Sequence, residues 1–173
     1  MISQKMIETL NKQLNKEFYS SYLYLNISNY FYDRDLDGYG NYFAVQSQEE
    51  QAHAHLIRDY IIYQGAKVEL EAIQKPTENL KDLKQVLDLV VAHERGITQS
   101  IYNIYGMAED ERDYATRQYF DWFVKEQVEE ENTAEAMVKR FDLFGQDAKG
   151  LMQLDNELKS VTFTAPAKLV VIN

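Results

Sequence analysis

Apolar residues recur at steps of three and four along four long stretches of the chain. That spacing places side chains on one face of an α-helix, so each stretch is expected to form an amphipathic helix. The expected helices cover about 4–33, 38–65, 79–106 and 110–144. The inner face of the first is predicted to carry Ile7, Leu10, Leu14, Phe18, Ser21 and Leu25. Long helices packed side by side are the architecture that this pattern predicts.

Capping residues and glycines indicate where these helices begin and end. Asn79 and Asp110 can each accept a hydrogen bond from a first-turn amide, so they are the expected N-caps of the third and fourth helices. Gly65 and Gly106 are expected to end the second and third helices, because glycine adopts the left-handed conformation without strain. With only 7 Gly and 2 Pro in the chain, long helices are the default.

The connections predict how the helices are joined. Short links after the first and third helices predict two antiparallel pairs. The connection over 66–78 contains Pro76 and is long enough to return along the bundle, which predicts one long crossover. A short fifth helix is expected over about 147–158. The tail over 159–173 is rich in β-forming residues and is expected to pack on the body or on a neighbour, and 1–173 is expected to be one domain.

Composition and charge exclude several function classes. The formal net charge is −10, which disfavours a nucleic-acid partner because phosphates repel such a surface. The absence of Cys excludes disulfides, thiolate-held zinc, iron–sulfur clusters and a cysteine nucleophile. No stretch approaches the ~18 consecutive apolar residues of a membrane helix, and the N-terminus has no apolar signal region. We therefore expect a cytoplasmic protein with no membrane partner.

Polar residues interrupt the apolar faces where aliphatic side chains would be expected. They are Glu17, Glu50, His53, Glu94, Gln127 and Glu130. Any one such residue alone is more often an exposed side chain on a misjudged face. The set is harder to dismiss, because Glu17 and Glu50 are 33 residues apart and so are Glu94 and Gln127.

The two halves of the set also share a local pattern. Residues 50 and 53, like residues 127 and 130, are three apart and therefore lie on one helix face. A shift of 77 residues maps the first three onto the last three, and also maps Glu49 onto Glu126. Two helix pairs related in this way would bring two half-sites together.

Four buried carboxylates require compensating positive charge, since an isolated buried charge costs several kcal/mol. Two divalent cations would balance them. Without metal, burial and mutual repulsion should raise the pKa of these carboxylates, and metal binding should then release protons. Carboxylates with one imidazole suit iron or manganese, and bridging carboxylates can hold two ions ~3.5–4 Å apart.

These motifs resemble those of the bacterial non-haem ferritins over nearly the whole chain. The resemblance rests on Glu17, the run Ser47-Gln-Glu-Glu-Gln-Ala-His53, Glu94 and the run Glu126-Gln-Val-Glu-Glu130, in that order. Inward-facing Glu and Glu-x-x-His ligands are the known example of a di-iron site in such bundles. The resemblance implies an all-α, ferritin-like four-helix bundle with one long crossover. It also implies a ferroxidase that oxidises Fe(II) with O2 or peroxide and stores ferric mineral in a 24-mer cage.

The resemblance also assigns roles to individual residues. Glu17, Glu50 and His53 would hold the first iron, and Glu50 would bridge to a second iron held by Glu94 and Glu130. Gln127 would lie close to the second iron. A third iron position would use Glu49, Glu126, Glu129 and Glu130, although a solvated acidic face is the plainer explanation of such a run.

Two aromatic residues could also take part. Tyr24 matches the tyrosine beside the family's site and could lend an electron, and Trp122 could do likewise. Both are equally reasonable as core aromatics. His55 and His93 flank the motifs but fall off the inner face, so both are expected to be surface histidines.

The chain departs from the haem-binding bacterioferritins. They have Glu-x-x-His in both half-sites, whereas this chain has Gln127-x-x-Glu130 in the second. They also have a haem-ligating Met where this chain has Gln51, so no haem is expected. Two alternatives remain open: a di-metal oxidase or peroxide-removing protein of the same architecture without bulk storage, and a metal-free structural bundle.

Overall fold

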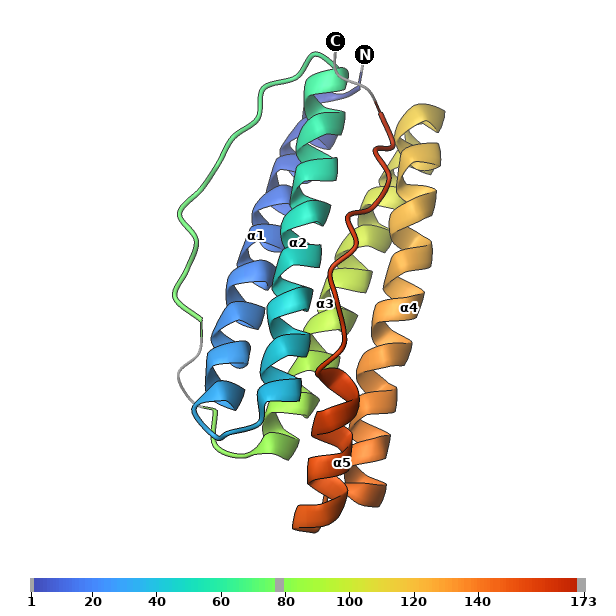
Figure 1. Ribbon diagram of the computed structural model, residues 1–173. Coiled ribbons are helices and arrows are strands. Elements are labelled where there is room, and N and C mark those ends of the chain that lie inside the picture. Colours follow the sequence, from blue (N-terminus) through green and yellow to red (C-terminus); the bar gives the residue numbers. More distant parts are fainter. Residues whose placement is uncertain (1, 77–79, 171–173) are drawn as a thin grey trace.

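Four long helices lie side by side and a shorter fifth helix packs at one end (Figure 1). The computed structural model describes residues 2–76 and 80–170. The helices are α1 (Gln4–Tyr32), α2 (Asp37–Tyr63), α3 (Leu83–Asp110), α4 (Tyr114–Phe144) and α5 (Ala148–Leu158). The described residues contain no strand. The expected all-α bundle with a short fifth helix is confirmed.

The long helices form two antiparallel pairs, α1 with α2 and α3 with α4, and the pairs approach each other most closely between α1 and α3. Two groups of buried apolar residues fill the interior. The first core cluster lies near the start of α1 and includes Leu10, Ile57, Ile101 and Phe120. The second core cluster lies near the α1–α2 turn and includes Ile27, Phe43, Leu87 and Phe141.

Several predicted helix ends differ from the structure. The Asp82 side chain, not Asn79, accepts the N-cap bond of α3, and Asn79 lies outside the described residues. Gly106 does not end α3, which continues to Asp110. Ile104 and Ala108, on either side of this glycine, are both buried, so the helix stays packed against the body beyond it. A glycine inside a helix costs only ~1 kcal/mol, which such packing offsets.

The fourth helix also begins later than predicted. Asp113, not Asp110, caps it by accepting a hydrogen bond from the Thr116 amide. The turn before it passes through Arg112, whose φ of 56° is left-handed. The prediction for Gly65 is confirmed, since its φ is 72° and its amide donates to Ile62 at the end of α2.

One predicted inner-face residue points outward. Leu25 is 44% exposed, while Tyr24 beside it is buried. The helix is turned so that residues 10, 14, 17, 24 and 31 face inward. Neighbouring residues on a helix are separated by ~100°, so Leu25 cannot share that face.

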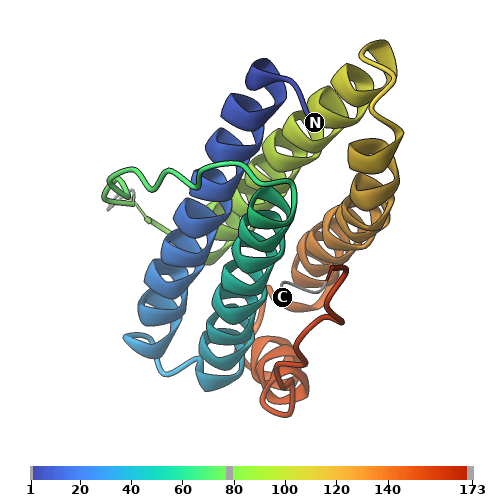
Figure 2. The same ribbon diagram turned by 90° about the horizontal axis from the view of Figure 1, so that it is seen from above.

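The connection between α2 and α3 is the predicted long crossover, and its described residues 66–76 run in extended form alongside α1 (Figures 1 and 2). Two side chains of α1 hold it in place. Asn11 donates to the Lys67 carbonyl and accepts from the Glu69 amide. Asn15 donates to the Glu69 carbonyl and accepts from the Glu71 amide. Each asparagine therefore satisfies backbone groups of a segment that has no strand partner.

Beyond α5, the chain returns along the body between α2 and α4 (Figures 1 and 2). The Asn41 side chain donates to the carbonyls of Leu158 and Val161 at the start of this segment. Near its end, Leu169 and Val170 pack against the first core cluster. The described part of the tail thus packs on the body, and residues 171–173 lie outside the described part. No helix of the described residues is long and apolar enough to span a membrane.

Candidate metal centre

The six predicted inward-facing polar residues meet between the two core clusters. They are Glu17 from α1, Glu50 and His53 from α2, Glu94 from α3, and Gln127 and Glu130 from α4. All six are buried. On every long helix, apolar residues of one cluster lie before them and apolar residues of the other lie after them. The helices therefore place one polar layer inside an otherwise apolar bundle.

The first half-site contains Glu17, Glu50 and His53. One oxygen or nitrogen from each lies within 4.8 Å of the others. The His53 Nδ1 atom is 3.7 Å from Glu50 Oε2. Neither Glu17 Oε2 nor Glu50 Oε2 accepts a hydrogen bond from an N–H or O–H donor of the described residues.

Bare buried carboxylate oxygens are rare because leaving them unsatisfied is costly. The two carboxylates can share a proton between them, but a bound cation would satisfy both oxygens at once. The half-site therefore fits a metal ion with oxygen and imidazole ligands.

The second half-site contains Glu94, Gln127 and Glu130. The Tyr24 hydroxyl donates to one oxygen of Glu94. The Gln127 amide donates to the other at 3.2 Å. Tyr24 and Gln127 therefore orient the Glu94 carboxylate. The Glu130 carboxylate lies close enough to interact with the charge of Glu94, so it is a second possible ligand of this half-site. This half-site differs from the first in having an amide where the first has an imidazole.

Burial controls the electrostatics of the centre. It raises the pKa of Glu17 and of Glu50, and the neighbouring carboxylates raise both further. Burial also raises the pKa of Glu94, although the hydrogen bonds from Tyr24 and Gln127 oppose this. The pKa of Glu130 is raised by burial and by the charges of Glu50 and Glu94. Without a cation, the folded centre therefore favours protonated carboxyls.

A second group of possible ligands adjoins the first. One atom each from His53, Glu126 and Glu130 lie within 4.8 Å of one another. Glu49 is half-buried and accepts a hydrogen bond from Gln46. Burial raises the pKa of both Glu49 and Glu126.

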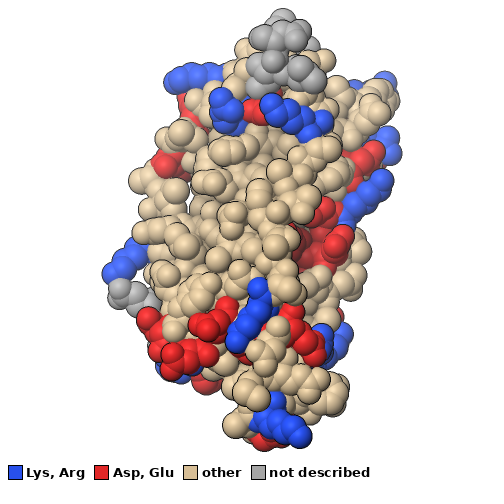
Figure 3. All heavy atoms as spheres, in the orientation of Figure 1, with Lys and Arg blue, Asp and Glu red and all other residues tan. Residues whose placement is uncertain are grey.

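Glu129 is exposed, unlike the other residues of the predicted third position. Figure 3 shows acidic side chains gathered at mid-height along α4, beside the C-terminal segment. The acidic rim, which consists of Glu49 from α2 and Glu126 and Glu129 from α4, adjoins the buried centre at His53 and Glu130. The rim can attract cations, and its Glu126, together with the buried Glu130, is placed to share one with His53.

One histidine is less exposed than the sequence predicted. His93 is half-buried: its Nε2 lies 2.8 Å from the Ser20 hydroxyl and its ring meets the Tyr24 ring edge-on. Burial lowers its pKa to about 4. The residue after it, Glu94, faces the bundle axis, so His93 points sideways into the contact between α1 and α3. His55 is exposed, as predicted.

The sequence interpretation also missed Gln13. Its amide donates to Glu17 Oε1 at 2.7 Å, and it is only 1% exposed. The signal was its position four residues before Glu17, on the same helix face. The ring of Trp122 lies edge-on to that of His53, with centroids 5.4 Å apart, so it contacts the centre directly.

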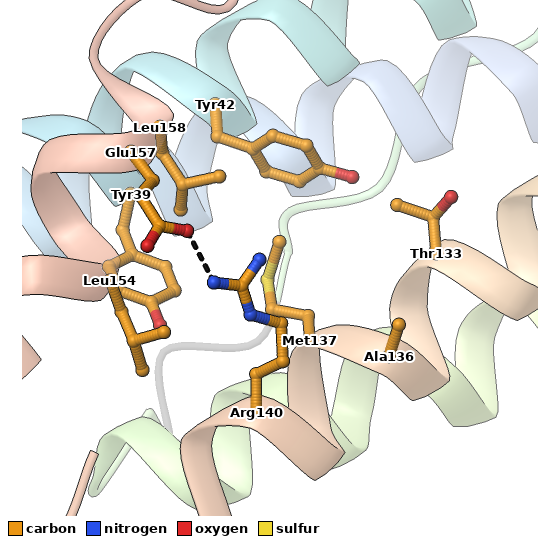
Figure 4. Close-up of a pocket in the computed structure, with 9 residues that line it drawn as sticks. All are labelled: Tyr39, Tyr42, Thr133, Ala136, Met137, Arg140, Leu154, Glu157 and Leu158. Carbon is orange, nitrogen blue, oxygen red and sulfur yellow. Dashed lines mark hydrogen bonds and ion pairs between the residues drawn. The ribbon is translucent and has the colours of Figure 1, made fainter. Parts of the chain in front are cut away.

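A separate cavity of about 150 Å³ lies between α2, α4 and α5 (Figure 4). Its walls include Tyr39, Met137 and Leu154, and Arg140 pairs with Glu157 at one side. None of the predicted ligands lines it. Tyr42 lies between this cavity and the metal centre. Burial raises the pKa of its hydroxyl, and the charges of Glu130 and Glu49 raise it further. This cavity is therefore distinct from the candidate metal centre.

The family model of the ferritin-like domain matches residues 7–144, which include every predicted ligand. The chain belongs to the ferritin family. It is 33% identical over 164 residues to the bacterial non-heme ferritin of Campylobacter jejuni, covering 95% of this chain and 98% of that one. It is 32% identical to that of Staphylococcus haemolyticus, over 94% of this chain and 98% of the other.

Solved ferritin structures agree with this assignment. An open-pore ferritin from the archaeon Archaeoglobus fulgidus matches with a TM-score of 0.91 and 39% identity, covering 93% of this chain and 98% of that one. An engineered closed form of the same ferritin matches with a TM-score of 0.92 and 40% identity, covering 95% and 100%. The ferritin-like fold predicted from the sequence is confirmed.

Proposed function

We propose that this protein stores iron and that it oxidises Fe(II) at the buried centre before the ferric product is deposited as mineral. The observation that carries the proposal is the pair of bare carboxylate oxygens, Glu17 Oε2 and Glu50 Oε2, inside a layer of four buried glutamates. Without cations, such a layer of buried carboxylates destabilises the fold, so a metal-free structural role does not explain it.

Charge supports two ions rather than one. Two divalent cations balance the four carboxylates of Glu17, Glu50, Glu94 and Glu130. In this proposal Glu17 and His53 hold the first iron, Glu94 and Glu130 hold the second, and Glu50 lies between the half-sites and bridges them. Gln127 orients Glu94 rather than acting as a strong ligand, since its amide nitrogen points at that carboxylate.

The chemistry proposed is a two-electron oxidation. Each of two Fe(II) ions gives one electron, and O2 takes both together with two protons to form hydrogen peroxide; with peroxide as the oxidant, the O–O bond breaks and water forms. The protein fixes the two ions near one another and excludes competing reactions. Tyr24 keeps Glu94 in position through its hydroxyl, and it is near enough to lend a further electron.

The acidic rim of Glu49, Glu126 and Glu129 extends the same proposal. An ion held there, with Glu130, would be a third iron on its way between the centre and the mineral. Relatives named bacterial non-heme ferritins support storage as the purpose. Storage needs a closed cavity, so we propose self-association into a 24-mer cage, with iron, oxygen and peroxide as the small partners and the cytoplasm as the location.

The test is an anaerobic Fe(II) titration followed by exposure to air. Two tightly bound irons per chain and a fast oxidation phase are expected. The His53→Ala, Glu130→Ala double variant should lose the fast phase, whereas His55→Ala, which changes an exposed histidine of the same helix, should keep it. A fast phase that survives in the double variant contradicts the proposal.

The second candidate function is peroxide removal or small-molecule oxidation by the same centre, without bulk storage. It is supported by the centre's completeness within one chain, which would allow oxidation without a cage. Counting iron per particle after repeated loading separates the two functions. Iron far in excess of the two ions per chain of the centre indicates storage, and a count that stays near two indicates an oxidase.

A further inference from the structure

A continuous line of hydrogen bonds leads from the buried Glu17 carboxylate to the outer surface between α1 and α3. The Gln13 amide nitrogen donates to Glu17 Oε1 at 2.7 Å. The Ser100 hydroxyl donates to Gln13 Oε1 at 2.5 Å. The ammonium group of Lys16, which is exposed, donates to Ser100 Oγ at 2.7 Å. All three bonds join side chains, and none of these three residues is among the expected metal ligands.

The two ends of this line, the Lys16 ammonium and the Glu17 carboxylate, favour one direction for its bonds. An ammonium group can only donate, so the Ser100 oxygen must accept from it. The hydroxyl proton of Ser100 is then donated to the Gln13 carbonyl oxygen, which faces Ser100. As a result the Gln13 amide nitrogen faces Glu17, which is the only orientation that stabilises a carboxylate there. The opposite amide orientation would place two oxygens against each other.

This line makes the two oxygens of Glu17 unequal. Oε1 accepts the Gln13 hydrogen bond, and Oε2 accepts none from the described residues. Oε2 is the oxygen left free beside Glu50 and His53. Gln13 therefore prevents the carboxylate from rotating away and presents one oxygen, rather than two, to an incoming cation.

The opposite half-site is positioned differently. Both oxygens of Glu94 accept hydrogen bonds, from Tyr24 and from Gln127. Gln13 thus acts on Glu17 alone, and its influence should be confined to one of the two ions.

We propose that Gln13 is a positioning residue for the first half-site, and that Ser100 and Lys16 act through it by fixing the orientation of its amide. This inference rests on the proposed function, because it concerns the same pair of ions. Partners of metal ligands commonly change metal affinity by about tenfold to a hundredfold when removed. The expected effect of removing Gln13 is therefore a loss of affinity of about tenfold or more for one ion.

The experiment is a calorimetric titration of the full-length protein with Co(II), which reports binding without any oxidation. Gln13→Met keeps the length of the side chain and removes both hydrogen bonds. The matched control is Gln4→Met, because Gln4 donates to Glu8 at the same i,i+4 spacing on the same helix but in solvent. Gln13→Met should lower the affinity for one Co(II) ion by about tenfold or more and leave the affinity for the other near its wild-type value. Gln4→Met should change neither affinity.

Ser100→Ala provides a second variant with little effect on packing, since it removes only a hydroxyl. It should lower the affinity for the same ion by less than Gln13→Met does. The double variant should be no worse than Gln13→Met alone, because residues of one hydrogen-bonded line are not additive. Additive losses, or equal weakening of both ions, would overturn the proposal and indicate general loosening of the bundle.

The outcomes also separate this inference from the proposed function. Wild-type protein that binds no pair of ions overturns both. If wild-type protein binds two ions and Gln13→Met binds them equally well, only the role of Gln13 is overturned. If Gln13→Met does not fold, Ser100→Ala decides: a titration identical to wild type overturns the role, and a selective loss of one ion supports it.

Discussion

The carboxylate of Asp155 in α5 accepts a hydrogen bond of 2.8 Å from the backbone amide of Gly38, at the start of α2. It also accepts one from the Tyr39 amide at 3.0 Å. Leu36, the N-cap residue of α2, offers no side-chain bond of its own. Asp155 therefore caps α2 from another helix. Glycine is required at position 38, because a Cβ there would overlap the Asp155 carbonyl oxygen.

We predict that Asp155→Ala destabilises the protein by roughly 1–3 kcal/mol, because it leaves two buried amides without an acceptor. The loss should appear in chemical denaturation followed by circular dichroism. Lys159→Ala is the control, since it removes only the exposed partner of Asp155, whose Nζ lies 3.6 Å from Oδ2. If the two variants lose equal stability, the cap contributes nothing and the ion pair explains the effect.

The buried carboxylates give the metal-free protein a distinct pH dependence. Burial raises the pKa of Glu50 well above its ordinary value near 4.5. Above that value the unfolded chain loses the proton while the folded protein retains it. The contribution of Glu50 to the stability of the metal-free protein is therefore fully present below pH ~4.5, and it is lost as the pH rises through the folded-state pKa.

Glu50→Gln should consequently raise the unfolding temperature of the chelator-treated protein at pH 8 by a few degrees. The two unfolding temperatures should converge as the pH falls toward 4.5. With Co(II) present the order should reverse, because the variant lacks the bridging ligand. Glu8→Gln, at an exposed position of α1, should show no such difference. Equal metal-induced stabilisation of Glu50→Gln and wild type would refute the bridging role.

The asparagine contacts with the crossover predict local effects of two substitutions. Asn11→Ala should speed hydrogen exchange at the Glu69 amide, and Asn15→Ala should speed it at the Glu71 amide, each by about tenfold if the lost bond contributes ~1.4 kcal/mol. Each variant is the control for the other. Equal acceleration at both amides would mean that the crossover opens as one unit.

The polar layer was predictable because its signal is physical and repeated. A carboxylate on a buried helix face is costly, so Glu17, Glu50, Glu94 and Glu130 at related intervals were difficult to explain as a solvated surface. Helix rotation was less predictable. On α1, Leu25 continues one run of apolar residues and Tyr24 another, and only packing against α2 and α3 selects the face that carries Tyr24.

Other features depend on contacts that a single helix cannot reveal. Asp110 and Asp113 are equally good capping residues, and the left-handed turn at Arg112 selects the second. Gln13 gains its role from Ser100, which is 87 residues away in sequence. His93 is similar, since only the approach of α3 to α1 places Ser20 against its ring.

His93 supplies the last prediction. Burial lowers its pKa from about 6.5 to about 4 in the folded protein, so between these values the unfolded chain binds the extra proton and the folded protein does not. The contribution to stability is thus present above pH ~6.5 and is lost as the pH falls toward 4, by roughly 2 kcal/mol for a partly exposed ring.

The measurement is the difference in unfolding free energy between wild type and His93→Gln in chelator-containing buffer from pH 7 to pH 4. The glutamates titrate in both proteins, so their contributions cancel in the difference. Glutamine can still bond to Ser20 but does not titrate, so wild type should lose stability relative to the variant as the pH falls. His55→Gln, at an exposed site, should remain parallel to wild type. If His93→Gln also remains parallel, His93 is solvated, and its contact with Ser20 does not persist in solution.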